Sequence, residues 1–340
     1  MSALMTSNGS IHDVQKKGAS MDSAAWRFTR FINDEKIGLL ETAVSGPDGA
    51  WLRDALKDRD LFFALRNDRI DVYHQGALIY RIDFSGDDIE AQTHVKYLMI
   101  DVPKSPYINL RKSDFAYEPS AYMQGRYREG VSLQQIKKAA TYYSGMENFG
   151  VYRAIKDDPL VVDVEVALMR DNAPPADSVP TTTEQRQGRM QDRIDIVRLE
   201  EAAGGYALVF WEAKHYSNAQ LFNDEVFEQL DRYEDQILKR EAELLAAFRN
   251  VCAFNLRLAR LRTELGVVGI DSEHVNRLQG LADGTVPLHV DKNPRLFAFG
   301  FDQAQKILRW RAREKQLIER LGLGRLKAIG RPKAGELGRS

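Results

Sequence analysis

The sequence has almost no cysteine. Its 340 residues include one, Cys252, which excludes an internal disulfide and any zinc site built from several cysteines. The six histidines are scattered and form no H-x-x-x-H pair, which argues against a histidine zinc site. Because Cys252 lies in an apolar stretch with helical spacing, we expect a buried, structural thiol.

Long hydrophobic runs and an excess of one charge sign are missing too. No stretch approaches the roughly 18 apolar residues that span a bilayer, and residues 1–20 lack the apolar centre of a signal peptide. The formal net charge is -1, which by itself argues neither for nor against a nucleic-acid partner. The sequence therefore predicts a soluble, cytoplasmic protein with no membrane partner.

Two common catalytic motifs are also absent. The sequence has no G-K-[ST] phosphate-binding loop and no G-x-S-x-G elbow, so it gives no support to a P-loop enzyme or a serine hydrolase.

The pattern along the chain predicts four parts. Residues 1–22 are polar and Ser-rich, which is typical of disorder. Residues 23–125 predict an α+β accessory domain, 126–305 a nuclease-like domain, and 306–340 a basic C-terminal helix and tail.

Within the accessory domain, apolar residues recur at helical spacing from Trp26 to about Leu56. The runs that follow alternate like strands, with turns expected at Asn67-Asp68 and Gln75-Gly76. This part of the sequence predicts a small antiparallel meander.

The second domain alternates helices and strands. A helical segment precedes the strand "PLVVDVEVALMR", and a Pro- and Thr-rich loop over residues 171–188 leads to the strands "RIDIVRLE" and "YALVFWEAK". A helix then begins near Asn223 and continues, with a break, to about Glu264, and a late strand covers residues 295–302. This order predicts an α/β layer with a mixed sheet.

Charged residues end the most buried of these strands. "YALVFWEAKHY", residues 206–216, is apolar on both faces, as a covered central strand is, until Glu212 and Lys214. Open α/β sheets usually place their sites at such carboxyl ends.

The preceding strand supplies a second carboxylate. If residues 202–205 form the hairpin loop, Asp195 lies opposite Glu212, whereas a tighter Gly204-Gly205 turn places it opposite Lys214. Any loop of even length keeps Asp195, Glu212 and Lys214 on one face.

Two carboxylates this close repel unless a proton or cation lies between them. Mg²⁺ typically takes one or two carboxylates plus waters and phosphate oxygens, and the carbonyl of Ala213 could add a ligand. Lys214 would then orient the attacking water or stabilise charge at phosphorus. A lone E-x-K is a very weak signal, because Glu and Lys are common and the pair often marks a solvated strand end or a surface ion pair. The argument therefore depends on Asp195.

These residues resemble the PD-(D/E)XK nuclease superfamily. "RIDIV" holds Asp195, "VFWEAK" holds Glu212 and Lys214, and "EQLDRY" holds Gln229 and Tyr233 in the Q-x-x-x-Y motif of RecB-type members. The resemblance covers about residues 130–302. It implies a restriction-endonuclease-like core, a mixed sheet flanked by helices, with Asp195 and Glu212 on the metal and Gln229 and Tyr233 supporting the site and the substrate strand.

Several alternatives stay open. The family often has another acid on its first core helix, for which Glu147, Glu129 and Glu165 are candidates. Asp192 is an alternative to Asp195, although it should point to the opposite face, and Tyr233 could be a core residue. "RIDIV" also lacks the proline of the family motif.

The resemblance implies a Mg²⁺- or Mn²⁺-dependent deoxyribonuclease, in defence against foreign DNA or in repair. The alternative is an inactive nucleic-acid-binding or partner-binding protein on the same fold. The basic residues between Lys306 and Arg339 would bind phosphates, or else form a solvated helix face. A homodimer or a protein partner bound through the accessory domain is also compatible with the sequence.

Overall fold

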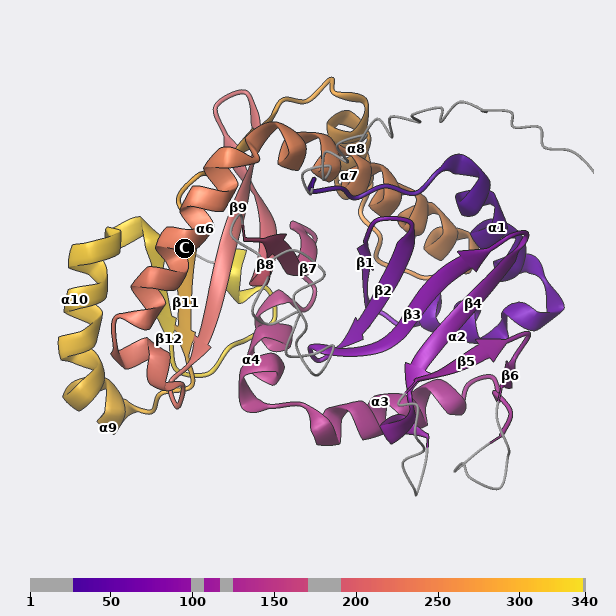
Figure 1. Cartoon of the computed structure of the whole chain (residues 1–340), viewed down its shortest axis with the longest axis horizontal. Coiled ribbons are helices and arrows are strands. Elements are labelled where there is room, and N and C mark those ends of the chain that lie inside the picture. The colour runs from indigo at the N-terminus through magenta and orange to yellow at the C-terminus, as the bar shows by residue number, and fades with distance from the viewer. Residues whose placement is uncertain (1–26, 99–106, 117–124, 171–190, 339–340) are drawn as a thin grey trace, which may run out of the picture.

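Two sheets lie on either side of a long shared helix. The computed structural model describes residues 27–98, 107–116, 125–170 and 191–338. Helix α7 (Glu241–Glu264) contacts α2 (Ala50–Lys57) and strand β1 (Phe62–Leu65) of the first sheet (Figure 1). It also contacts strands β7 (Val161–Met169) and β10 (Leu288–Val290) of the second sheet. The described chain is therefore mixed α/β. The segments expected to be a disordered start (1–22) and a loop (171–188) lie outside the described residues.

The first sheet is the predicted antiparallel meander, in which each strand pairs with the next along the chain. Both predicted turns are confirmed, and Asp68, Gln75 and Gly76 adopt the positive φ that tight hairpin turns require. Its strands are β1 (Phe62–Leu65), β2 (Arg69–His74), β3 (Ala77–Ser85), β4 (Asp88–His94), β5 (Tyr107–Arg111) and β6 (Asp114–Phe115).

The helical stretch expected up to Leu56 is divided into two helices. Asn33 caps α1 (Asp34–Ser45) by accepting a hydrogen bond from the Lys36 N–H. The chain then turns through Gly46–Gly49 into α2 (Ala50–Lys57). A Cβ at Gly49 would lie 1.7 Å from the Ala43 carbonyl oxygen, so this close turn requires glycine.

Helices α3 (Ser132–Tyr143) and α4 (Met146–Ile155) link the two sheets. Helix α3 packs against β2 and β3 of the first sheet, whereas α4 packs against β9 of the second. The two sheets are thus joined by α3–α4 and by α7 (Figure 1).

The second sheet is mixed, as predicted. Strand β8 pairs antiparallel with β7 and β9, and β11 pairs parallel with β9 and β12. Helix α6 (Glu225–Lys239) and α7 pack on one face of this sheet, and α4 packs on the other. The strands are β7 (Val161–Met169), β8 (Gln191–Ala202), β9 (Gly205–His215), β10 (Leu288–Val290), β11 (Arg295–Phe299) and β12 (Leu326–Ile329).

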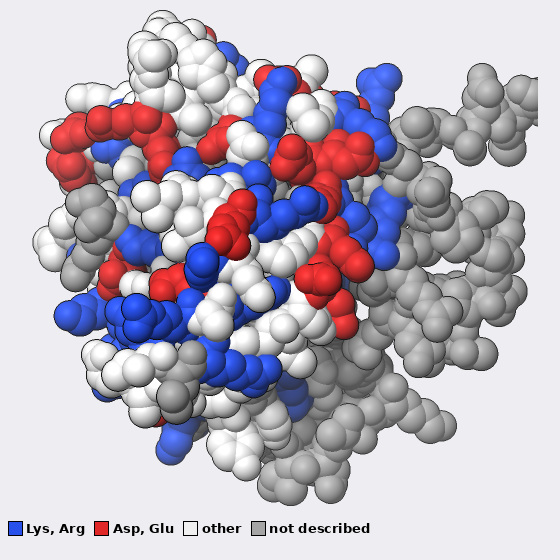
Figure 2. All heavy atoms as spheres, turned by 90° about the vertical axis from the view of Figure 1, so that its left-hand side faces the viewer, with Lys and Arg blue, Asp and Glu red and all other residues white. Residues whose placement is uncertain are grey.

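The segment expected to be a basic helix and tail is part of the fold. Helix α10 (Arg311–Leu321) is followed by β12 at the sheet edge, while α8 (Ser272–Asp283) packs on α7. Arg313 donates to the carbonyls of Leu221 and Asn223, and Arg320 and Arg325 pair with Asp231 and Glu234. Basic and acidic side chains are interspersed on this side of the molecule (Figure 2). At least three of these basic side chains are therefore engaged in contacts within the fold.

Cys252 is buried in α7, as expected, and burial raises the pKa of its thiol to about 12. In the described ranges, no helix has both the length and the apolar character needed to cross a bilayer.

Candidate functional site

The β8–β9 hairpin brings Asp195 next to Glu212. A two-residue turn at Ala203 and Gly204 links the strands, and Glu201 pairs with Tyr206, which is the register expected for a 202–205 loop. The ladder runs to Ile196 opposite Trp211. Continued by one residue, this register places Asp195 beside Glu212.

The two strands separate at this point. Strand β8 begins at Gln191 and β9 continues to His215, but the paired residues end at Ile196 and Trp211. Beyond them, the Ala213 N–H donates to Asp195 Oδ2 at 2.7 Å, so a side-chain carboxylate replaces a backbone acceptor. In a strand, the N–H and C=O of one residue point to the same side, so the Ala213 carbonyl also faces Asp195.

Strand β7 is distorted at the same level. Val164 pairs with Ile196 and Val166 with Ile194, and between them Glu165 has φ of 55°. This left-handed conformation is uncommon for a residue other than glycine and often occurs at functional sites. The sheet is therefore irregular on both sides of Asp195.

Glu212 and Lys214 are buried together at the end of β9, with 2% and 5% of their surfaces exposed. Lys214 Nζ lies 2.5 Å from Glu212 Oε1, and the Tyr233 hydroxyl lies 3.0 Å from Oε2. Asp195, in contrast, is half-buried, and no hydrogen bond reaches its Oδ1 within the described ranges. A cation could thus bind the free Oδ1 of Asp195 directly. To bind Glu212, it would have to displace Lys214 or Tyr233 from the carboxylate.

The pKa shifts indicate an excess of negative charge around Asp195 and Glu212. Burial, followed by repulsion from Glu212 and Glu165, raises the pKa of Asp195 well above its ordinary value. Burial also raises the pKa of Glu212, although Lys214 offsets part of this effect. Burial opposes the charge of Lys214, but the attraction of Glu212 outweighs it and raises the pKa of Lys214. The lysine stays charged, and the carboxylates need a further positive charge to ionise together.

Two of the three candidate further acids lie at this site. Glu147, in the first turn of α4, accepts from the His215 N–H at 2.9 Å and raises the pKa of Glu212 by repulsion. Glu165 has a pKa raised by burial and pairs with Arg193 Nη1 at 3.3 Å. Glu129 instead pairs with Arg53, next to the first sheet, and takes no part in this cluster.

Gln229 and Tyr233 contact each other and the carboxylate. Gln229 Nε2 donates to the Tyr233 hydroxyl at 2.6 Å, and this hydroxyl can donate either to the Arg193 carbonyl oxygen at 2.6 Å or to Glu212 Oε2. Tyr233 is fully buried, so it is a core residue and a neighbour of the site at once. Its hydroxyl links α6 to β8 and β9 and fixes the orientation of Glu212.

Asp192 has a different role from Asp195. Arg170 and Gln236 donate to it at 2.6 and 2.7 Å, and despite burial these hydrogen bonds lower its pKa. Its charge is already compensated, so Asp192 is a structural anchor for α6.

Sequence reasoning missed Arg193 and Asn218. Arg193 pairs with Glu165, and Asn218 Nδ2 donates to Glu147 Oε2 at 3.0 Å. Arg193 is adjacent to "RIDIV", which could have drawn attention to it, whereas no pattern marks Asn218.

The donor set fits a hard divalent ion. Within the described ranges, no three His, Cys, Asp or Glu side chains are arranged so that they could hold one ion. Two carboxylates and a backbone carbonyl nevertheless suit Mg²⁺, which takes few protein ligands and keeps several waters. For Glu212 to serve as a ligand, Lys214 Nζ must leave its Oε1.

Comparison with protein-family models, with curated proteins and with solved structures found no match for this chain.

Proposed function

We propose that the protein is a Mg²⁺- or Mn²⁺-dependent nuclease that cleaves phosphodiester bonds in DNA, on a restriction-endonuclease-like core. One observation carries this proposal: Asp195 and Glu212 adjoin one another with raised pKa values and share their surroundings with the buried Lys214. A protein does not gain stability from uncompensated buried carboxylates, and such perturbed groups concentrate at functional sites.

The roles follow from the chemistry of each group. Asp195, Glu212 and the Ala213 carbonyl would hold the ion, which when bound supplies positive charge against the phosphate. Lys214 would orient the attacking water and stabilise charge at phosphorus, because its ammonium remains protonated. Gln229 and Tyr233 are positioning residues that hold the Glu212 carboxylate.

Exposed aromatic residues near the junction of α3 and α4 suit the bases of a substrate strand. Three aromatic residues and one methionine are exposed and are here called the α3–α4 surface: Tyr142, Tyr143, Phe149 and Met146. Tyr142 is 84% exposed. Lys96 Nζ stands 5.3 Å from the Tyr143 ring centroid, so cationic charge adjoins this surface. Unpaired bases stack on such aromatics while cations bind the backbone. Because Met146 precedes Glu147, a strand on this surface would pass next to the carboxylates.

The test is a cleavage assay on plasmid, linear duplex, single-stranded DNA and RNA, with Mg²⁺, Mn²⁺ or EDTA. We expect metal-dependent cleavage of DNA that Glu212→Gln abolishes. Glu201→Gln is the matched control, because Glu201 is exposed on the same hairpin and away from the site. Equal cleavage by wild type and Glu212→Gln would refute the proposal.

The buried Glu212–Lys214 ion pair favours a second candidate, an inactive nucleic-acid-binding protein. This candidate predicts salt-sensitive DNA binding that EDTA leaves unchanged, with no cleavage in either metal.

A further inference from the structure

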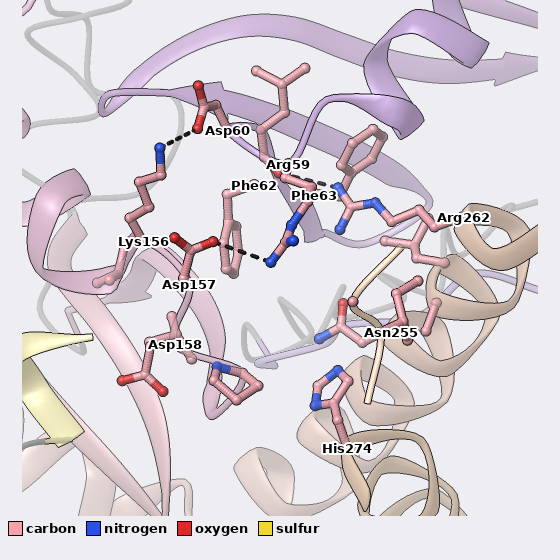
Figure 3. A pocket seen from close by; sticks show the side chains of 18 of the residues that line it. Arg59, Asp60, Phe62, Phe63, Lys156, Asp157, Asp158, Asn255, Arg262 and His274 are labelled. Atoms are coloured by element: carbon pink, nitrogen blue, oxygen red, sulfur yellow. Dashed lines mark hydrogen bonds and ion pairs between the residues drawn. The ribbon is translucent and has the colours of Figure 1, made fainter. Parts of the chain in front are cut away.

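A pocket of about 310 Å³ lies between the edge of the first sheet and helices α7 and α8 (Figure 3), and no residue of the β8–β9 hairpin lines it. Much of its wall is apolar. Both sheets and α7 contribute apolar residues to that wall, which includes Phe62, Phe63, Val161, Leu258, Val267 and Ile270. A volume and lining of this kind are typical of small-molecule sites.

One side of the pocket carries cations with room for an anion. Arg59 is 54% exposed and pairs with Asp157 at 3.4 Å, an exposed pair that a ligand anion can displace. Arg262 donates to the carbonyls of Leu56 and Leu61, and in the described part of the chain no ion pair joins it to a carboxylate. Burial lowers the pKa of Arg262 to about 10; the attraction of Asp58 offsets part of this effect, and Arg59 adds repulsion. An anion between the two arginines would reduce the repulsion between them and stabilise the charge of Arg262.

Most of the acids around the pocket are already compensated. Asp60 pairs with Lys137 and Lys156, and Asp158 pairs with Arg198 at 2.9 Å. They therefore contribute much less repulsion toward an anionic ligand than free carboxylates would.

The facing wall offers a hydrogen-bond acceptor. His274 and Asn255 lie across the pocket from Arg59 and Asp157 (Figure 3). Asn255 donates its Nδ2 to the Val162 carbonyl oxygen, which leaves Oδ1 as an acceptor. Such an acceptor suits an amino group, which has hydrogens to donate.

We propose that this pocket binds a nucleoside monophosphate whose base carries an exocyclic amino group. The phosphate would lie against Arg59, and the base would lie among the apolar residues with its amino group toward Asn255. This inference stands on the pocket alone and does not depend on nuclease activity.

Binding there would couple the two halves of the chain. The pocket includes residues 59–63 before and within β1, and also Val161 and Val162 at the start of β7, the strand that carries Glu165. A ligand that contacts both sheets stabilises their present arrangement.

The experiment is isothermal titration calorimetry of the full chain with AMP, and with IMP, adenosine and inorganic phosphate as comparison probes. IMP has a carbonyl in place of the amino group of AMP. Adenosine lacks the phosphate, and inorganic phosphate lacks the nucleoside. We expect AMP to bind about tenfold or more tightly than each of the three, since one charge-assisted or buried hydrogen bond contributes that much.

Two variants locate the site. Arg59→Gln should weaken AMP binding about tenfold, and Ala259→Leu should fill the pocket and abolish it. Arg260→Gln is the control, because Arg260 follows Ala259 on α7 but is exposed, contacts Gln279 and does not line the pocket. Thermal melts verify that each variant folds. No AMP binding, equal binding of AMP and phosphate, or AMP binding that both variants leave unchanged would overturn the proposal.

Discussion

Two charge clusters meet strand β7 two residues apart, one at Asp163 and the other at Glu165, and they differ in the balance between carboxylates and cations. In the Asp163 cluster (Arg30, Arg66, Asp71 and Asp163), Arg66 Nη1 lies 2.8 Å and Arg30 Nε 3.3 Å from the two oxygens of Asp163. Arg66 also pairs with Asp71 at 3.2 Å. Every carboxylate in this cluster thus has an arginine partner.

The Asp195 cluster (Asp195, Glu212, Glu165, Glu147 and Lys214) has more carboxylates than cations. Arg193 adds a second cation, but it is exposed and reaches Glu165 alone. In the Asp163 cluster the charges are balanced, as a buried ion-pair link between two sheets requires. The Asp195 cluster has an excess of negative charge that an incoming cation would neutralise, which is why we propose it as the catalytic site.

The largest expected effect is on cleavage at the unbalanced cluster. Glu212→Gln and Lys214→Ala should each lower the cleavage rate about a thousandfold or more, because one removes a proposed metal ligand and the other the positive charge proposed to act at phosphorus. Asp163→Asn should leave the rate per folded molecule within about threefold, since its side chain faces arginines. Single-turnover cleavage assays, corrected for the fraction of folded protein, measure this difference. Equal losses of cleavage rate in all three variants would contradict the different roles of the two clusters.

At the Asp163 cluster, the largest expected effect of a substitution is on the free energy of unfolding. Asp163→Asn should lower the free energy of unfolding by about 3–5 kcal/mol, because Arg30 and Arg66 lose a buried partner. Asp231→Asn, at an exposed pair with Arg320, should change it by less than about 1 kcal/mol. Urea unfolding followed by tryptophan fluorescence provides both values. A small change in Asp163→Asn would mean that the arginines find other partners.

On the α3–α4 surface, Met146 precedes Glu147 of the Asp195 cluster in the chain, and a substitution on this surface should affect the binding of a DNA strand that crosses it. Tyr142→Ala should weaken the binding of single-stranded DNA by about 1–3 kcal/mol, the contribution of one stacked base. Fluorescence anisotropy with Glu212→Gln as the background measures binding without cleavage. Leu323→Ala, at an exposed apolar residue elsewhere, is the control. An equal loss of duplex binding would argue against stacking.

Tyr233→Phe tests whether the Tyr233 hydroxyl orients Glu212 in the Asp195 cluster. The hydroxyl that lies 3.0 Å from Glu212 is removed while the buried ring stays, so the cleavage rate should fall about tenfold. Metal concentration dependence should shift as well, because a less ordered Glu212 binds the ion less tightly. A rate loss with unchanged metal dependence would place the role of Tyr233 elsewhere.

The smallest expected effect is a change in thermal stability with pH and with a divalent ion. The raised pKa values of Asp195 and Glu212 mean that the folded protein favours their protonated forms. Without a divalent ion, this stability is present at low pH and is lost as pH rises from the ordinary carboxylate pKa through the raised values.

Mg²⁺ should therefore raise the melting temperature more at pH 8 than at pH 5. In EDTA at pH 8, Asp195→Asn should raise it by roughly 2 °C, because the variant removes the repulsion. Differential scanning calorimetry measures both, and a fall in the melting temperature of Asp195→Asn would mean that the carboxylate is already compensated.

Local patterns predicted the parts of the fold that depend on neighbours in sequence. The turns at Asp68 and Gly76 follow from residues that tolerate positive φ, and the β8–β9 register follows from the length of one loop. These features also bring Asp195 next to Glu212, which is why the candidate site could be predicted.

The rest depends on partners far apart in the chain. Asp163 meets Arg30 and Arg66 across 133 and 97 residues, and no spacing rule indicates such pairs. Strands β10 and β12 have three and four residues, too short for a periodic pattern. The left-handed Glu165 was weighed as a fallback acid, but its conformation has no signature in sequence.

Anomalous diffraction from a crystal soaked in Mn²⁺ tests the central claim most directly. We expect one strong peak in contact with Asp195, Glu212 and the Ala213 carbonyl, with Lys214 Nζ moved away from Glu212 Oε1. No peak at this place after a saturating soak, with the Lys214–Glu212 pair unchanged, would contradict the account.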